Sequence, residues 1–427
     1  MATMVSASWS KYVQDLYNTR GPPLLKSLNI EELEKNFVEE LKDYPEAWTY
    51  VVSGAGTSST TRANRAEFEK WRILPCMLRD AGVRDLQTTI LGKKMNSPIL
   101  IGPVGAHALV HKDGELATAR AAAKVGVTFC LSSPSTRSME EVAKANGDSE
   151  RWFQLYWPKS DDITKSLLKR AKANGFTALI VTLDTMVLGW RIHDLEKLYS
   201  PASHGVGVQN ALSDPVFMAR YGLQPIYGEH PDFPFDQPKV QAALAAGDEK
   251  ITQRVKLAKD WVQEIGGKFR TWEDLKFLRE AWDGPIVLKG IQHVADAEKA
   301  LDVGIEGIIV SSHGGRQIDG AVPSLYALDR VCLSPKIKAA QESGKFTVLF
   351  DSGIRTGSDV IKALALGAQG VLIGRMMMYA LGMGGEAGVE QILRSLLADT
   401  EITMGLSGFK GLSEFQGKRD EILVKMG

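Results

Sequence analysis

Eight short apolar runs constrain the fold of this 427-residue chain more than any other feature of its sequence. Each run is rich in β-branched residues and ends at a glycine, a turn residue or a polar side chain. The runs cover residues 98–104, 127–133, 152–157, 178–184, 285–290, 307–313, 347–353 and 370–375. Because they are continuously apolar rather than alternating, they are typical of parallel strands that are buried on both faces.

Segments with helical periodicity separate these runs. Apolar residues recur at intervals of three and four, often followed by a glycine, in 113–125, 139–147, 162–175, 293–304 and 358–367. Eight strand-then-helix units predict an α/β fold of the (β/α)8 TIM-barrel type. An open doubly wound sheet would be expected to carry a GxGxxG turn after its first strand, and the segment IGPVGAHALV has none.

Two regions lie outside this series of strands. Residues 1–90, with helix candidates at 30–41 and 45–52, precede the first strand, and residues 185–284 separate strands four and five. A crossover needs only short loops and one helix, for which 272–282 is the candidate, so the rest of this insertion is expected to form a lid or an oligomer contact. We therefore predict one domain over 1–427, with an N-terminal helical cap (1–90), a barrel (91–400) carrying a lid insertion at about 190–268, and a C-terminal tail (401–427).

Composition and charge exclude several classes of protein. The chain has 51 basic and 51 acidic side chains, so the basic surface of a nucleic-acid-binding protein is not expected. Cys76, Cys130 and Cys332 are far apart, which predicts neither a disulfide framework nor a cysteine metal site and favours a reducing compartment. The apolar runs are much shorter than the roughly 20 residues that span a bilayer, and the sequence shows no signal peptide or SKL-type ending. We expect a cytoplasmic protein with no bound metal and no membrane partner.

Polar side chains gather at the carboxyl ends of the predicted strands, which in a barrel surround the active site. They are Gln154 and Tyr156, Thr182 and Asp184, Lys289, His313 and Arg316, Asp351 and Arg355, and Arg375, which follows Gly374. Taken singly, each has a structural interpretation, such as a hydrogen-bonded core histidine, a helix-capping aspartate or an arginine in a surface ion pair. Burying so many ionisable groups around one mouth without a ligand would be costly, so their convergence favours a functional site.

The loops after strands seven and eight, DSGIRTGSD and IGRMM, have the composition of a phosphate site. They combine glycines with Arg355 and Arg375, at the position where barrels commonly bind phosphate. A phosphorylated cofactor or substrate is therefore expected there. Lys289 lies at the end of another strand of the barrel, so it would face the end of a planar cofactor that is far from the phosphate.

Several segments together resemble the FMN-dependent L-2-hydroxy acid oxidases and dehydrogenases: SSHGGRQIDGAVPSL, FQLYW, VTLDT, IVLKG, LFDSGIRTGSDVIKALALGA and VLIGR. The similarity extends from YVVSGAG to the last barrel helix. Within this family, VTLDTMVLGWRIHDL, the long insertion and Gly105 are most similar to lactate 2-monooxygenase, although Gly105 is equally well interpreted as a turn glycine. The family signature has Asn before the histidine, where this chain has Ser312.

The resemblance implies a catalytic and substrate-binding set. His313 would be the base that takes a proton from the 2-hydroxy acid, and Asp184 would orient its imidazole and stabilise the imidazolium. The substrate would be held by Arg316 and Tyr50 at its carboxylate and by Tyr156 at its oxygen, with Arg191 as a second positive charge.

The resemblance also implies a site for FMN. Lys289 would lie near N1 and the C2 carbonyl of the flavin ring and favour the anionic reduced form. The other contacts would come from Pro103, Val104, Gly105, Ser132, Gln154, Thr182 and Ser311 near the ring, and from Asp351, Gly353, Arg355, Gly374 and Arg375 around the ribityl phosphate.

The implied reaction transfers two electrons from a small, lactate-like L-2-hydroxy acid to FMN, which O2 reoxidises. If the keto acid stays bound while peroxide forms, the peroxide would decarboxylate it, and a long lid would favour this outcome by slowing release. The alternatives are an oxidase that releases keto acid and H2O2, a dehydrogenase with another electron acceptor, and a non-catalytic flavin-binding barrel. Isomerases and IMP dehydrogenase-like enzymes also have FMN- or phosphate-binding barrels, but they would need a different catalytic group. The family also implies a homo-oligomer, a tetramer or larger.

Overall fold

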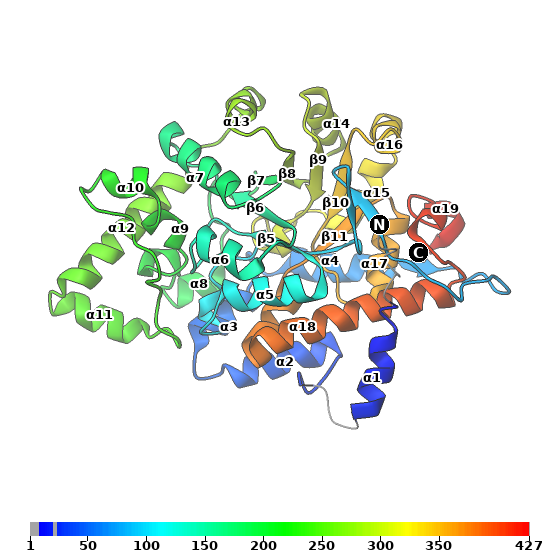
Figure 1. Ribbon diagram of the computed structural model, residues 1–427, viewed down its shortest axis with the longest axis horizontal. Coiled ribbons are helices and arrows are strands. Elements are labelled where there is room, and N and C mark those ends of the chain that lie inside the picture. Colours follow the sequence, from blue (N-terminus) through cyan, green and yellow to red (C-terminus); the bar gives the residue numbers. More distant parts are fainter. Residues whose placement is uncertain (1–7, 20–23, 427) are drawn as a thin grey trace.

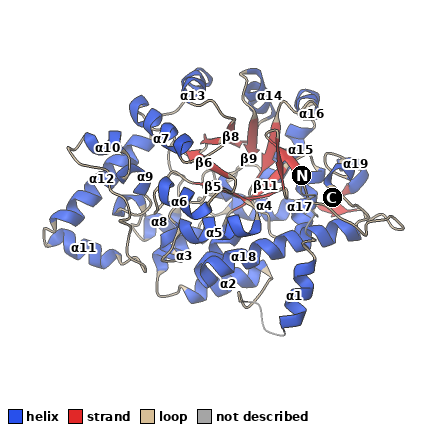
Figure 2. Ribbon diagram, in the orientation of Figure 1, coloured by secondary structure: helices blue, strands red, loops and turns tan. Residues whose placement is uncertain are grey.

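The computed structural model describes residues 8–19 and 24–426, and at its centre is a closed barrel of eight parallel strands (Figure 1 and Figure 2). The strands are β4 (Ile99–Ile101), β5 (Thr128–Leu131), β6 (Arg151–Leu155), β7 (Leu179–Thr182), β8 (Ile286–Ile291), β9 (Gly307–Val310), β10 (Thr347–Phe350) and β11 (Gly370–Ile373). Strands that follow one another in the chain are neighbours in the barrel, and β11 closes it by pairing with β4. The predicted (β/α)8 barrel is confirmed.

The barrel interior is filled with side chains, so the molecule has no central pore. Each strand contributes one residue to this cluster: Leu100, Cys130, Trp152, Ile180, Val287, Ile309, Leu349 and Leu372. Ala178 and Ile90 also belong to the cluster, and Ile90 comes from a hairpin of β2 (Thr88–Ile90) and β3 (Lys93–Met95) that closes one end of the barrel. Because the interior is packed, a ligand can only bind at an end of the barrel.

The helices that surround the barrel begin and end at local sequence signals. They are α5 (Glu115–Val125), α6 (Met139–Asn146), α7 (Asp161–Ala173), α13 (Leu275–Ala281), α14 (Val294–Asp302), α15 (Ser324–Cys332), α16 (Pro335–Glu342), α17 (Gly357–Ala365) and α18 (Arg375–Leu406). Ser138 and Glu141 form a capping box at the start of α6, and Gly126 ends α5 at φ 76°. Helices α15, α16 and α18 were not among the predicted helical segments, and α18 continues past residue 400, the expected end of the barrel. No helix in the described part of the chain is both long and apolar enough to cross a membrane.

Two helices of the N-terminal region, α3 (Pro45–Val52) and α4 (Ser59–Glu69), lie at the end of the barrel opposite the β2–β3 hairpin. The region also contains α1 (Lys11–Thr19), α2 (Ile30–Glu40) and β1 (Trp71–Ile73). The segment between α3 and α4 meets the loop after β9, where Ala55 N donates to Gly315 O at 2.9 Å. Strand β1 pairs antiparallel with β12 (Leu423–Lys425) at the other end of the chain, and α2 packs along α18 (Figure 1).

The insertion between β7 and α13 is largely helical. It contains α8 (Ile192–Glu196), α9 (Gln209–Leu212), α10 (Pro215–Ala219), α11 (Gln237–Ala245) and α12 (Glu249–Ile265), of which α10 to α12 project to one side of the barrel (Figure 1). Arg170 of α7 anchors the insertion by donating to Asn210 O at 2.9 Å and to the Asp214 carboxylate at 3.1 Å. The start of the insertion is joined to the segment after α12, where Gly267 N donates to Met186 O at 2.6 Å.

Candidate active site

A cavity of about 820 Å³ lies at the carboxyl ends of the strands, within the size range of small-molecule sites. It is lined by many of the residues predicted to form a site: Tyr50, Pro103, Val104, Gly105, Tyr156, Arg191, Lys289, His313, Arg316, Asp351, Gly353, Arg355, Gly374 and Arg375. Asp184 and Ser311 lie outside this lining but hydrogen-bond to His313 and Lys289, which belong to it. Ser132, Gln154 and Thr182 also lie outside this lining and form a buried row at the ends of neighbouring strands.

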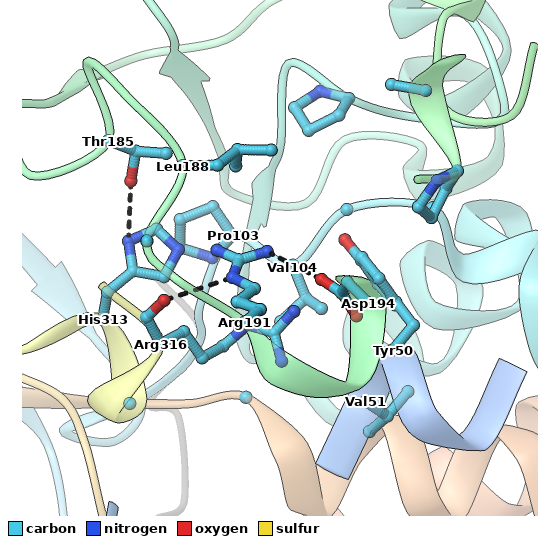
Figure 3. A pocket seen from close by; sticks show the side chains of 18 of the residues that line it. Tyr50, Val51, Pro103, Val104, Thr185, Leu188, Arg191, Asp194, His313 and Arg316 are labelled. Carbon is cyan, nitrogen blue, oxygen red and sulfur yellow. Dashed lines mark hydrogen bonds and ion pairs between the residues drawn. The ribbon is translucent and has the colours of Figure 1, made fainter. Parts of the chain in front are cut away.

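The imidazole of His313 is held by its Nδ1 atom. This atom lies 2.8 Å from Oδ1 of Asp184 and 3.2 Å from Oγ1 of Thr185, the second contact being visible in Figure 3. Asp184 can come this close to the barrel because Gly290 has no side chain; a Cβ there would lie 2.8 Å from Cβ of Asp184. The contacts to Nδ1 leave Nε2 as the ring nitrogen available for proton transfer.

Burial and charge set the protonation of this pair. Burial lowers the pKa of His313 below its ordinary value, although the Asp184 carboxylate opposes the shift. Burial would raise the pKa of the Asp184 carboxyl, but His313 and Lys289 outweigh it and hold this pKa well below the usual range. A neutral imidazole beside an ionised carboxylate is the arrangement of a general base.

Two arginines give one wall of the cavity a positive charge. Arg316 donates from Nη1 to Ser53 O at 2.8 Å, and its guanidinium carbon lies 5.2 Å from the centre of the Tyr50 ring. Figure 3 shows Arg191 between the carbonyl of Arg316, at 3.1 Å, and the carboxylate of Asp194, at 3.9 Å. Burial and the nearby arginines lower the pKa of Arg316 to about 9. With one carboxylate against two guanidinium groups, this wall suits an anion.

Two tyrosines line the same cavity and remain protonated at neutral pH. Burial raises the pKa of Tyr156 to about 12 and also raises the pKa of Tyr50. Each hydroxyl can therefore donate a hydrogen bond to an oxygen of a bound ligand.

Lys289 is a buried cation. Its Nζ donates to Ser311 Oγ at 3.1 Å and lies 3.4 Å from Oδ2 of Asp351. Burial disfavours the ammonium form, but the carboxylates of Asp351 and Asp184 outweigh burial and raise the pKa of Lys289. Ser311 Oγ also accepts from the backbone N of His313 at 3.0 Å. This hydroxyl therefore connects Lys289 to the loop after β9 that carries His313, which we call the histidine loop.

A row of buried polar side chains crosses the ends of β5, β6 and β7. Ser132 Oγ donates to Gln154 Oε1 at 2.9 Å, and Gln154 Nε2 donates to Thr182 Oγ1 at 2.9 Å. Such a row of donors and acceptors at strand ends can hydrogen-bond along the edge of a planar ring.

Glycines and arginines line the part of the cavity formed by the loops after β10 and β11. Gly353 is in a left-handed conformation at φ 106°, and Gly374 immediately precedes the first turn of α18. Arg375 donates to the carbonyls of Val51, Gly314 and Ser53 at 3.1, 2.8 and 2.9 Å, so its guanidinium also fastens α3 and the histidine loop to the barrel. Arg355 donates from Nη1 to Ile354 O at 3.0 Å.

Gln317 is part of the site but was not singled out from the sequence. Its Nε2 donates to the carbonyls of Asp184 and Val187 at 2.7 and 3.0 Å, and its Oε1 accepts from Arg191 Nη2 at 2.8 Å. One amide thereby joins the loop after β7 to the loop after β9. Its place directly after Arg316 in SSHGGRQ was the signal that could have identified it.

Comparisons with known proteins give consistent results. The sequence profile of a family described as FMN-dependent dehydrogenase matches residues 41–421. The FMN-dependent alpha-hydroxy acid dehydrogenase qulF of Penicillium citrinum is 43% identical over 90% of this chain and 87% of its own length. An L-lactate oxidase of Lysinibacillus sphaericus is 36% identical over 95% of this chain and 97% of its own length. A crystal structure of mandelate oxidase matches with a TM-score of 0.72 and 32% identity, covering 94% of this chain and 99% of that chain.

Proposed function

Because this chain belongs to the FMN-dependent dehydrogenase family, we propose that it oxidises a small L-2-hydroxy acid with O2 as acceptor and decarboxylates the keto acid that it retains. The coarser activity, FMN-dependent oxidation of a 2-hydroxy acid, follows from the family and from relatives named L-lactate oxidase and 2-hydroxyacid oxidase. The observation that carries the proposal is that His313, which is hydrogen-bonded to Asp184 behind it, lines one cavity together with two arginines.

The cavity has the chemistry that FMN requires, and FMN, when bound, takes up two electrons from the substrate and passes them to O2. The flavin ring is planar with polar edges, which suits Lys289 and the buried row of Ser132, Gln154 and Thr182. Ser311, Asp351 and the loop of Pro103, Val104 and Gly105 would complete the surroundings of the ring and ribityl chain. The phosphate would lie against Gly353, Arg355, Gly374 and Arg375, where glycine backbone, guanidinium groups and the start of α18 come together.

The substrate carboxylate would bind between Arg316 and Arg191, with the hydroxyl of Tyr50 as a further donor. Arg316 offers two parallel N–H groups, the geometry that matches a carboxylate. The protonated hydroxyl of Tyr156 would donate to the substrate oxygen on the carbon that is oxidised. These contacts fix the orientation of the carbon next to the carboxylate, where the reaction takes place.

His313 would remove a proton from this oriented substrate through Nε2. Because its Nδ1 is bonded to Asp184, the imidazolium that forms is stabilised by a carboxylate that stays ionised. Lys289 would provide a fixed positive charge at the cofactor end of the cavity while electrons leave the substrate.

Two features support retention of the keto acid and therefore decarboxylation. At Gly105 a Cβ would lie 2.9 Å from Cγ of Pro134 and 3.1 Å from the hydroxyl oxygen of Tyr50, so glycine leaves room for the tyrosine. The insertion also lines the cavity with residues 186–202 and with the end of α12, which would slow product release. The balanced reaction converts a 2-hydroxy acid and O2 into a carboxylic acid one carbon shorter, CO2 and water.

The side chain of the substrate is proposed to be uncharged and apolar. Val104, Met186 and Trp190 line the cavity, together with Val187, Leu188, Leu195 and Leu198. Of the charged residues that the insertion contributes to the cavity, Asp194 already has a partner, because its carboxylate lies 3.9 Å from Arg191. A substrate side chain that is a methyl group or a larger apolar group can pack against these apolar residues, whereas a charged substrate side chain would be buried there without a partner.

A simple oxidase is the second candidate, favoured by the two relatives named L-lactate oxidase. The two are separated by incubating FMN-loaded protein with L-lactate in air and quantifying acetate, pyruvate and H2O2 together. Acetate without free peroxide supports the proposal, whereas pyruvate with matching peroxide identifies an oxidase. A dehydrogenase would be identified by three results together. L-lactate would reduce the flavin without oxygen, the reduced flavin would not react with O2, and an artificial electron acceptor would support rapid turnover. If L-lactate leaves the flavin oxidised, larger apolar L-2-hydroxy acids are tested in the same way, and failure of all of them would refute the proposal.

A further inference from the structure

The backbone that carries His313 is strained. His313, Gly314 and Gly315 have φ angles of 55°, 65° and 76°, so three consecutive residues are in the left-handed region. Glycine adopts this region readily, but a histidine is held there only when the surrounding structure fixes it. The contacts on either side of His313 therefore decide where its imidazole points.

Asn64 of α4 holds the residue that precedes His313. Its Nδ2 donates to Ser312 Oγ at 2.9 Å, and its Oδ1 accepts from Ser324 N at 2.9 Å. Ser324 Oγ in turn accepts from Ser312 N at 2.7 Å. Asn64, Ser312 and Ser324 are all buried, so water cannot replace these bonds without opening the structure.

Thr61 of α4 holds the residue that follows His313. Its Oγ1 donates to Gly314 O at 3.2 Å, and the backbone of α4 packs directly against Gly315. A Cβ at position 315 would lie 2.5 Å from Thr61 N, which leaves this part of the loop no room to move toward the helix. Because Thr61 and Asn64 are three residues apart, they lie on one face of α4.

We propose that Asn64 and Thr61 are positioning residues for His313, gripping the loop on both sides of it. Neither residue lines the cavity, so both act through Ser312 and Gly314 rather than on a ligand. The proposal rests on the proposed role of His313 as the base. Helix α4 belongs to the N-terminal region, so a segment distant from the barrel strands in the sequence would set the geometry of the reacting group.

The test measures how fast substrate reduces the flavin without oxygen in FMN-loaded Asn64→Ala and Thr61→Val proteins. Thr61→Val removes the hydrogen bond to Gly314 while keeping the side-chain shape, so it decides the question if Asn64→Ala does not fold. Asn146→Ala is the matched control, because Asn146 is also buried and donates to a backbone carbonyl, Ala119 O at 3.0 Å, away from the cavity. FMN content and Tm are measured for every variant.

We expect the limiting rate of flavin reduction in Asn64→Ala to fall at least about tenfold, and in Thr61→Val to fall less, because small misplacements of a reacting group are costly. The substrate concentration for half-maximal rate should change less than about threefold. Asn146→Ala should keep the wild-type rate even if its Tm falls as far. Rates in both α4 variants equal to that of Asn146→Ala would overturn the positioning role. A wild-type rate in His313→Ala would instead overturn the base assignment, so the two failures are distinguishable.

Discussion

The carboxylate of Asp184 meets the imidazole of His313 across 129 residues of chain, with Oδ1 and Nδ1 2.8 Å apart. Oδ1 also accepts from Thr185 Oγ1 at 2.9 Å, whereas the buried Oδ2 has no hydrogen-bond donor among the residues that the structure describes. The carboxylate therefore makes all of its hydrogen bonds through one oxygen, the oxygen that faces the base.

Replacing this carboxylate is expected to slow the reaction strongly. Asp184→Asn keeps the shape of the side chain but removes the charge that stabilises the imidazolium, so the limiting rate of flavin reduction should fall roughly 10²- to 10⁴-fold. The measurement is anaerobic stopped-flow with the FMN content checked by absorbance. Asp194→Asn, in the same cavity but bound to Arg191, is the control and should lose much less. A loss under about threefold in Asp184→Asn would contradict the role of the pair.

The pH dependence of kcat/KM should reflect the protonation of the buried imidazole of His313. Because His313 must be neutral to accept a proton and burial lowers its pKa, kcat/KM should rise with pH along a limb that lies below the ordinary histidine value of about 6.5. Asp184 opposes this lowering, so the limb should lie at still lower pH in Asp184→Asn. Profiles of kcat/KM over the acid range check both directions. A wild-type limb above the ordinary histidine value would be incompatible with a base of lowered pKa.

Removing the buried cation should change the redox potential. In Lys289→Met the positive charge is lost while Asp351 and Asp184 remain, so reduced FMN should be less stable and its midpoint potential more negative. A shift of about 30–60 mV is expected, since 30 mV corresponds to about 1.4 kcal/mol for a two-electron couple.

The potential is measured by dye-coupled reduction of the purified holoprotein. Lys362→Met is the control, because Lys362 is also buried but donates to Phe68 O outside the cavity, and it should leave the potential unchanged. Equal potentials in wild type and Lys289→Met would place the cation away from the flavin.

A methyl group at residue 105 should change the products. In Gly105→Ala the new Cβ would press on Pro134 and displace the hydroxyl of Tyr50, weakening the hold on the carboxylate. The keto acid should then leave before it is decarboxylated, so the ratio of pyruvate plus H2O2 to acetate should rise about tenfold, and KM should rise. Gly82→Ala is the control, since a Cβ there makes only an ordinary contact at 3.4 Å with Asp80. An unchanged product ratio would show that Gly105 is only a turn residue.

The barrel, and the polar side chains that gather at the carboxyl ends of its strands, could be predicted because burial leaves a strong pattern in the sequence. Strands covered on both faces must be continuously apolar, so polar residues can only follow where a strand ends, as Asp184 and His313 do. Once the strands are located, parallel geometry brings all of these ends together.

The residues outside the strands that position these side chains could not be predicted from the local sequence pattern. Asn64 is 248 residues from Ser312, and α4 reads as STTRANRAEFE, a polar segment that is typical of a solvent-facing helix. Thr60 and Asn64 of this helix are buried where they hydrogen-bond to the segment after β9, and hydrophobic periodicity contains no signal for such a contact. Helix α12 is a different case, because its amphipathic pattern over Glu249–Ile265 is a sequence signal from which this helix could have been predicted.

The pairing of β1 with β12 has a consequence for when the protein can first become active. Strand β1 directly follows α4, whereas its partner, Leu423–Lys425, comes after all eight barrel strands in the chain. During translation the helices that carry Tyr50 and Asn64 are therefore made before any barrel strand, yet β1 can pair with β12 only after every barrel strand has been made. A nascent chain can form its barrel strand by strand, but we expect catalytic competence only after residues 423–425 have been synthesised.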